Sequence, residues 1–135
     1  MDFSEYGLTD SELEILKKAS EEGRLIMVTA SVSANGTVVG YTPVTGKQFV
    51  MVRASVKGWV PSSTDNVVYK LKNDTNVRES FTVTLSTTIP NEPFRFSTKG
   101  DVLVGNSSKK YEIDVSDIGG SATVEGHLLG YIEDT

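Results

Sequence analysis

Polar and apolar residues alternate at period two through most of this chain, from Arg24 to near its end. Segments such as 67–73 (VVYKLKN) and 109–115 (KKYEIDV) place an apolar side chain at every second position. Successive side chains of a strand point to opposite faces, so each segment predicts a strand with one buried face. The longest, 48–58, should place Phe49, Met51 and Arg53 on one face and its valines on the other. Eight or nine such segments are separated by turn residues about every ten positions.

This pattern predicts the fold class. Half-buried strands suit antiparallel sheets packed face to face, because each sheet then buries one side. No helical pattern lies between the strands, so we expect neither crossover helices nor a parallel sheet. We predict an all-β protein, an antiparallel β-sandwich of jelly-roll type with about eight strands, more than the seven of an immunoglobulin-like sandwich. Asn35-Gly36 is a strong hairpin signal between the strands at 24–33 and 37–41.

The first 23 residues differ from the rest. Thr9 and Glu12 fit a capping box, and Gly23 is a natural stop, so we expect a short α-helix over residues 10–22. Its apolar residues form a narrow stripe, enough to lie on another surface. We therefore divide the chain into an N-terminal arm, 1–23, and a sandwich domain, 24–135. The arm is expected to bind a partner through its apolar residues Leu8, Leu13, Leu16 and Ala19.

Composition restricts the chemistry. The 135 residues include no cysteine and one histidine, which excludes disulfides and thiolate metal sites. A zinc site normally needs two or more nitrogen or sulfur ligands, and this chain offers one. The net charge of −5 disfavours nucleic acid as a partner. No apolar run approaches the roughly 18 residues of a membrane helix. The acidic N-terminus lacks the pattern of a signal peptide, so synthesis in a cytoplasm is expected.

Candidate catalytic residues are few. His127 lies in the last predicted strand, 122–133, where a lone histidine suits an ordinary strand position. The carboxylates that could act in pairs or bind calcium are Asp65, Asp74, Asp114 and Asp117, all in or beside turns where aspartate forms local hydrogen bonds. No calcium-loop or nucleophile-elbow motif is present. We expect no enzyme and no cofactor, with a calcium ion in a loop as a weaker alternative.

The last strand also contains two glycines on its inward side. Gly126 and Gly130 alternate there with inward-facing Val124, Leu128 and Ile132, while His127 and Tyr131 face outward. Glycine in a strand often marks a close approach of other atoms. We therefore expect something to pack tightly over both glycines.

Two further features concern partners. Trp59 is expected to be buried, but exposed aromatic residues could stack on sugar rings, and the candidates are Tyr41, Trp59, Tyr69, Tyr111 and Tyr131. Two or more of them coplanar and exposed would favour carbohydrate binding. The segment 77–86 (VRESFTVTLS), if it lies at a sheet edge, could pair with a second chain.

Several segments resemble one class of protein. They are TGKQFVMVRASV, LKNDT, KGDVLVG, KKYEIDV and the C-terminal LLGYIE, within roughly residues 45–135. In their order they are similar to small single-domain jelly-roll structural proteins of tailed phages and related viruses. The resemblance implies a capsid decoration or cement protein, or a tail or fibre module, often trimeric, without catalytic residues. We expect a symmetric homo-oligomer, for which the resemblance favours a homotrimer over a dimer. The resemblance also implies a place on a virion, bound to other capsid or tail proteins, and synthesis in the host cytoplasm. A carbohydrate-binding or adhesin module of a phage tail or fibre is the alternative.

Overall fold

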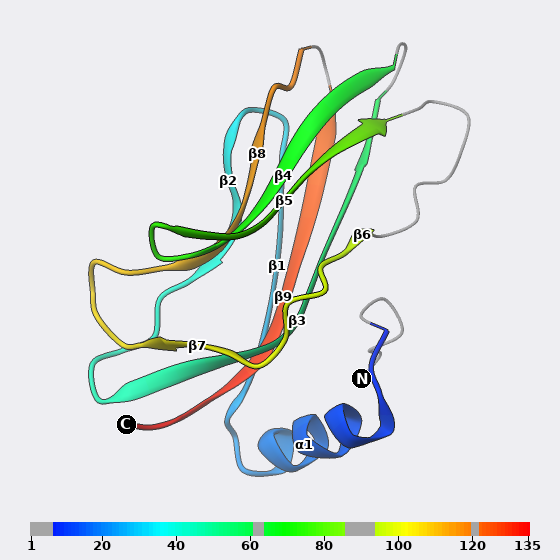
Figure 1. The fold of residues 1–135 in the computed structure, drawn as a ribbon. Helices are drawn as coiled ribbons and strands as arrows, with labels where there is room; N and C mark the ends of the chain where they lie inside the picture. The colour runs from blue at the N-terminus through cyan, green and yellow to red at the C-terminus, as the bar shows by residue number, and fades with distance from the viewer. Residues whose placement is uncertain (1–6, 61–63, 86–93, 120–121) are drawn as a thin grey trace.

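The chain folds as two antiparallel sheets packed face to face, with one helix against the outside of one sheet (Figure 1). The computed structural model describes residues 7–60, 64–85, 94–119 and 122–135. The helix of these ranges is α1 (Asp10–Glu21), and their strands are β1 (Leu25–Val32), β2 (Gly36–Tyr41), β3 (Lys47–Trp59), β4 (Asp65–Asn73), β5 (Asn76–Leu85), β6 (Phe94–Arg95), β7 (Asp101–Val104), β8 (Tyr111–Ser116) and β9 (Thr123–Asp134).

The strand order is that of a jelly roll. The first sheet, sheet A, has the order β1-β9-β3-β6, with β7 also paired to β3, and the second, sheet B, has the order β2-β8-β4-β5. The first strand pairs with the last, β2 with β8, β3 with β6 and β7, and β4 with β5. The chain is thus one long hairpin wrapped over on itself. This confirms the predicted all-β sandwich with a short N-terminal helix.

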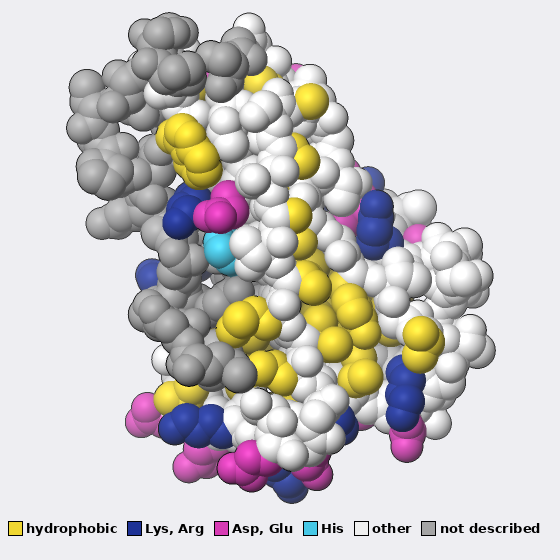
Figure 2. Space-filling model, turned by 180° about the vertical axis from the view of Figure 1, so that it is seen from behind, with side chains coloured by type: hydrophobic (Ala, Val, Ile, Leu, Met, Phe, Trp, Pro, Cys, Tyr) yellow, Lys and Arg dark blue, Asp and Glu magenta, His cyan; other side chains and the backbone are white. Residues whose placement is uncertain are grey.

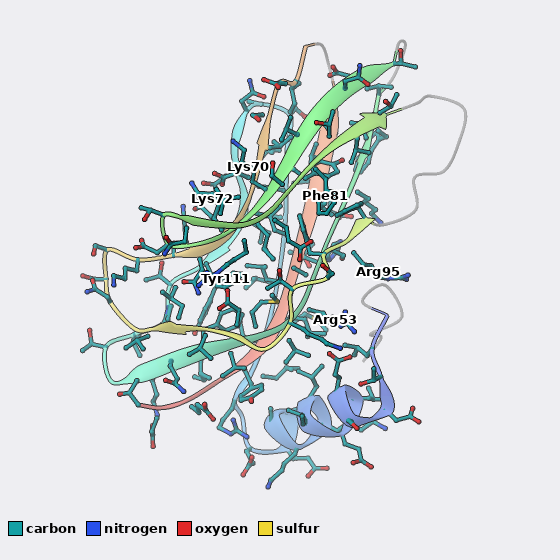
Figure 3. The ribbon with its side chains drawn as sticks, in the orientation of Figure 1. Arg53, Lys70, Lys72, Phe81, Arg95 and Tyr111 are labelled. Atoms are coloured by element: carbon teal, nitrogen blue, oxygen red, sulfur yellow. The ribbon has the colours of Figure 1, made fainter. Side chains whose placement is uncertain are left out.

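The hydrophobic core fills the space between the two sheets. Sheet A contributes Phe49, Met51 and Leu128, and sheet B contributes Tyr69 and Ile113, all almost fully buried. Burial of each such side chain contributes roughly 1.5–3 kcal/mol, so this core is the main source of stability. Figure 3 shows Tyr111 between the sheets, where its phenol donates a hydrogen bond to Asp101 Oδ2 at 3.0 Å.

The two glycines of β9 are tightly covered, as predicted. A Cβ atom on Gly126 would lie 2.8 Å from a methyl group of Val39 and 3.0 Å from one of Val38, both on β2. A Cβ atom on Gly130 would lie 2.1 Å from the backbone oxygen of Val50. Sheet B therefore packs on Gly126 through side chains, whereas at Gly130 the backbone of the neighbouring strand leaves no room.

The predicted hairpin at Asn35-Gly36 is wrong. β1 pairs with β9 and β2 pairs with β8, so the chain passes from sheet A to sheet B at this point. The Asn35 side chain accepts a hydrogen bond from the Ile118 amide at 2.9 Å. Asn-Gly favours a turn locally, but it does not decide which strands pair. The pairing partner of each strand depends on how its apolar face is buried in the whole domain. By contrast, residues 73–76 form a true hairpin between β4 and β5, with Asp74 at φ 58°.

The predicted faces of β3 are also wrong beyond its middle. The β3–β9 register shifts between Met51 and Arg53, which marks a β-bulge. Phe49 and Met51 face the core, and after the bulge Ala54 and Val56 do so, while Val52 packs on the outside with the helix. The prediction assumed strict alternation along the strand, so it could not account for the extra residue that the bulge adds.

Candidate functional site

Helix α1 packs against the outer face of sheet A. Leu16 is fully buried and forms a small second core with Val52 of β3 and Leu129 of β9. The predicted capping box is present: the Thr9 amide donates to Glu12 Oε1 at 2.9 Å, and the Glu12 amide donates to Thr9 Oγ1 at 3.2 Å. The helix is therefore built into the domain, and it ends one residue before the predicted boundary.

A charged pair fixes the helix to the sheet. Arg53 of β3 points toward α1 (Figure 3), and its guanidinium donates to both carboxylate oxygens of Glu12, each at 3.1 Å. Only 15% of the Arg53 side chain and 13% of the Glu12 side chain are exposed. Burial acts to raise the pKa of Glu12, but hydrogen bonds from the Thr9 backbone and from Arg53 hold it below its ordinary value.

The predicted partner-binding stripe is thus used within the chain itself. Leu16 and Ala19 have no exposed surface, and Leu8 and Leu13 are half-buried. In this conformation Leu16 and Ala19 are not available to another molecule. The exposed apolar residue of the helix is Ile15, with 47% of its surface accessible. It borders a shallow hollow of about 240 Å³ lined by Thr9, Glu12, Val50, Val52, Lys99, Gly100 and Tyr131.

His127 lies on the same face of sheet A, in a row of polar side chains. Its Nδ1 is 3.0 Å from Thr29 Oγ1, directly across the β1–β9 ladder, and its Nε2 is 3.4 Å from Glu125 Oε2. Glu125 also pairs with Lys57 at 3.2 Å. Desolvation acts to raise the pKa of Glu125, but Lys57 and His127 hold it below its ordinary value. The Thr29–His127 and Lys57–Glu125 contacts are cross-strand pairs of the kind that stabilise sheets, in agreement with the interpretation of His127 as a strand residue.

Trp59 is exposed, so its predicted burial is wrong. It ends β3, beyond the part of sheet A that the helix covers, and 41% of its surface is accessible. The other aromatic candidates do not join it: Tyr69 and Tyr111 are buried, and Tyr41 and Tyr131 are half-buried. Burial raises the pKa of Tyr69 to about 12. Among the aromatic residues predicted to bind sugar, Trp59 is the one that is exposed, so they form no platform.

The outer face of sheet B carries a charge ladder. Lys72 lies 3.3 Å from Glu112 and 3.2 Å from Asp114, and Lys110 lies 2.9 Å from Glu112. Figure 3 shows Lys70 and Lys72 on this side of the sheet. Burial and the neighbouring Glu112 raise the pKa of Asp114, whereas the lysines hold the pKa of Glu112 below its ordinary value against the effect of burial. The two carboxylates are held by lysines on a strand face, not across a cleft as a glycosidase requires.

The remaining predicted acidic residues lie apart. Asp65 accepts from the Gly119 amide at 3.0 Å, and Asp74 and Asp117 adopt positive φ angles in turns. The structure brings none of them together with Asp114. Over the described parts of the chain, no group of three or more acidic, histidine or cysteine residues could hold a metal ion.

Exposed apolar side chains gather at one end of the sandwich. Val44 precedes β3, and Val102 and Val104 belong to β7, with 65%, 40% and 55% of their surfaces accessible. The Lys47 amide donates to Val44 and the Gly105 amide donates to Lys47, which brings the two segments side by side. Elsewhere, the exposed Phe81 of β5 contacts the half-buried Phe94 of β6, and their ring centroids are 4.8 Å apart.

Comparison with protein-family models and with curated proteins finds no match for this chain. Within the described ranges, no helix is both long and apolar enough to cross a membrane. The resemblance to phage structural proteins stays a prediction from the order of strand segments in the sequence.

One feature of the helix–sheet contact was not predicted from the sequence. Arg53 stands in a strand otherwise rich in valine, and charged residues are seldom buried without a partner. That position was a signal for a nearby carboxylate, and Glu12, which also completes the capping box, supplies it.

Proposed function

We propose that this chain is a non-enzymatic structural module that attaches to a larger assembly, a virion surface in the first instance. The observation that carries the proposal is the jelly-roll wrapping itself, an architecture used by viral capsid domains, by lectins and by cupins. A fold alone does not define a function, so the surfaces decide between these classes.

The surfaces favour attachment over chemistry. Acidic and basic side chains pair with each other on both outer faces, as in the Lys72–Asp114 and Lys57–Glu125 pairs. Exposed apolar residues lie instead at the end of the sandwich and on α1, where Val104 and Ile15 are about half exposed. Exposed apolar groups rimmed by polar residues are typical of contact sites with other proteins. A capsid decoration or cement role is the form of this proposal that the resemblance implies.

Carbohydrate binding by a tail or fibre module is the second candidate. It rests on Trp59, which is exposed next to the polar row of Lys57, Glu125 and His127. A single tryptophan offers one flat apolar face to a sugar ring. Because the other aromatic residues are buried or half-buried, this candidate is the weaker of the two.

The test is co-sedimentation with particles. Cells that encode the chain are induced to release particles, and the particles are banded in a density gradient. We expect the chain to band with capsid protein, and a chain found only in the soluble fractions would contradict the proposal. Particles lacking the chain can then be mixed with purified variants. Ile15→Glu should lower binding through α1, whereas the matched Val77→Glu, at a similarly exposed position of β5, should not.

A further inference from the structure

Strand β1 lies at one end of sheet A and pairs there only with β9. All eight residues from Leu25 to Val32 are in register with β9, without a shift. No other backbone–backbone hydrogen bond involves these residues within the described ranges. One side of β1 therefore presents unpaired amide and carbonyl groups, a template on which another strand can pair.

Sheet edges in natural proteins are normally protected against such pairing. Charged residues, bulges, prolines and short strands are the usual devices. β5 has Arg78, Glu79 and a bulge against β4; β2 has a bulge against β8; β6 and β7 are short, and each carries a charge. β1, with the sequence LIMVTASV, has none of these devices. It is the one unprotected edge of the two sheets as described.

The core is also uncovered beside this edge. The residues of β1 that face sheet B are Ile26, Val28, Ala30 and Val32; Ala30 is exposed and the others are only half-buried. Their partners on β9, Leu128 and Val124, have no exposed surface. Figure 2, the view from behind, shows a band of hydrophobic side chains along this side of the molecule. A strand added to β1 would cover apolar surface that the domain leaves open.

We infer that β1 is a dimerisation edge, and that it pairs antiparallel with β1 of a second copy of this chain. A twofold axis through Thr29 places Ile26 opposite Val32 of the partner copy, and Val28 opposite Ala30. Inward-facing residues then meet inward-facing residues, as the period of two requires. Thr29 meets its own symmetry mate, and threonine pairs are favourable across strands.

The lack of charge in β1 favours a second copy of this chain as the strand that pairs with its free edge. A charged residue near a twofold axis would lie close to the same charge of its mate, and β1 has no charge. The strand is complementary to itself in size and polarity, so no other sequence has to be supplied. The pairing joins the two copies of sheet A into one continuous sheet. It produces a dimer, unlike the trimer that the resemblance implies.

The experiment measures the mass of the purified full-length chain by light scattering from about 1 to 100 µM. We expect a dimer, with Thr29→Lys weakening the association about tenfold or more, because two lysines would face each other at the axis. Thr82→Lys is the matched control, since Thr82 is an exposed threonine on the other long edge strand, β5. It should leave the dimer unchanged. Circular dichroism of both variants checks that they are folded.

Because the chain has no cysteine, a single introduced cysteine is its only thiol, and disulfide crosslinking provides a second test. This test detects the dimer without a mutation that weakens it. Paired residues of antiparallel strands have Cα atoms about 4.5–5.5 Å apart, within the range that a disulfide spans. Air and copper phenanthroline should therefore convert Thr29→Cys into a covalent dimer far faster than Thr82→Cys. A monomer throughout the concentration range, a trimer, or preferential crosslinking at Thr82→Cys would overturn the inference. None of these results depends on whether the chain binds a particle.

Discussion

The pairing of Glu12 with Arg53 predicts how firmly helix α1 is held. Glutamine in place of Glu12 keeps the capping box, since glutamine also serves at that position, but it removes the charge that faces Arg53. Breaking a buried ion pair costs about 3–5 kcal/mol. The side chains keep 13–15% exposure and one hydrogen bond can persist, so we expect Glu12→Gln to lower stability by about 2 kcal/mol.

The assay is urea unfolding, with a thermal melt as a check. A loss of about 2 kcal/mol corresponds to a fall in Tm of about 6–10 °C for a chain of this size. Glu22→Gln is the control, because Glu22 pairs with Arg24 on the exposed end of the helix and should leave stability unchanged. A double-mutant cycle with Arg53→Met should give a coupling of about 1–2 kcal/mol.

The pH dependence of Glu12 has a definite sign. Its pKa is lowered in the folded protein, so its contribution is present above the ordinary value near 4.3 and is lost as pH falls through the lowered value. The stability difference between the wild type and Glu12→Gln should therefore shrink on acidification below about pH 4. If Glu12→Gln costs no more than Glu22→Gln and shows no coupling to Arg53, the pair does not hold α1, and the helix is free to act as an arm.

Three further predictions concern the strands. In urea unfolding, Gly130→Ala should lower stability by about 2 kcal/mol or more, because the new methyl group meets the backbone of β3. Gly126→Ala should lower it by at most about 1 kcal/mol, because the valine methyl groups that it meets can shift. Equal losses would contradict this packing. Titration with mono- and oligosaccharides should leave Trp59 fluorescence unchanged, and saturable quenching would favour the carbohydrate candidate. The pKa of Asp114 is raised in the folded protein, so its contribution to stability is present below the ordinary value near 3.9 and is lost as pH rises through the raised value. Between pH 4 and 7 the wild type should therefore lose more stability than Asp114→Asn. Identical pH profiles of the two proteins would rule out that shift.

Much of the fold could be predicted from the sequence because its signals are local. The capping box at Thr9 and Glu12 defines the start of α1, and alternation locates each strand to within a few residues. The turn at 73–76 joins adjacent strands, so there the local signal and the pairing agree. The jelly-roll prediction followed from strand number and spacing, and the pairing of β1 with β9 confirms it.

The wrong predictions concern features that depend on contacts between residues far apart in the sequence. Asn35-Gly36 reverses the chain, but the two strands beside it belong to different sheets. The bulge after Met51 turns Arg53 outward, toward Glu12 of α1, and turns Ala54 and Val56 into the core. A strict period of two cannot predict this reversal of faces. Trp59 lies beyond the surface that the helix covers, so a residue expected in the core is exposed.

The candidate surfaces were harder to predict, because the same residues can serve either the chain or a partner. The apolar stripe of α1 was expected to bind another molecule, and Leu16 and Ala19 are buried against the chain's own sheet. The sequence makes the segment 77–86 a candidate interaction edge, and β5 does lie at an edge, but with charges and a bulge. The lack of charge in β1 was visible in the sequence, yet its meaning depends on its place at the end of sheet A.

We propose that this domain acts by assembly, beginning at the free edge of β1. Amide hydrogen exchange at low and high protein concentration tests it most directly, because pairing protects the outward-pointing amides of the edge strand. We predict that exchange within residues 25–32 slows as concentration rises, while exchange within residues 76–85 stays the same. Slowing confined to 76–85, or no dependence on concentration in either strand, would contradict the account.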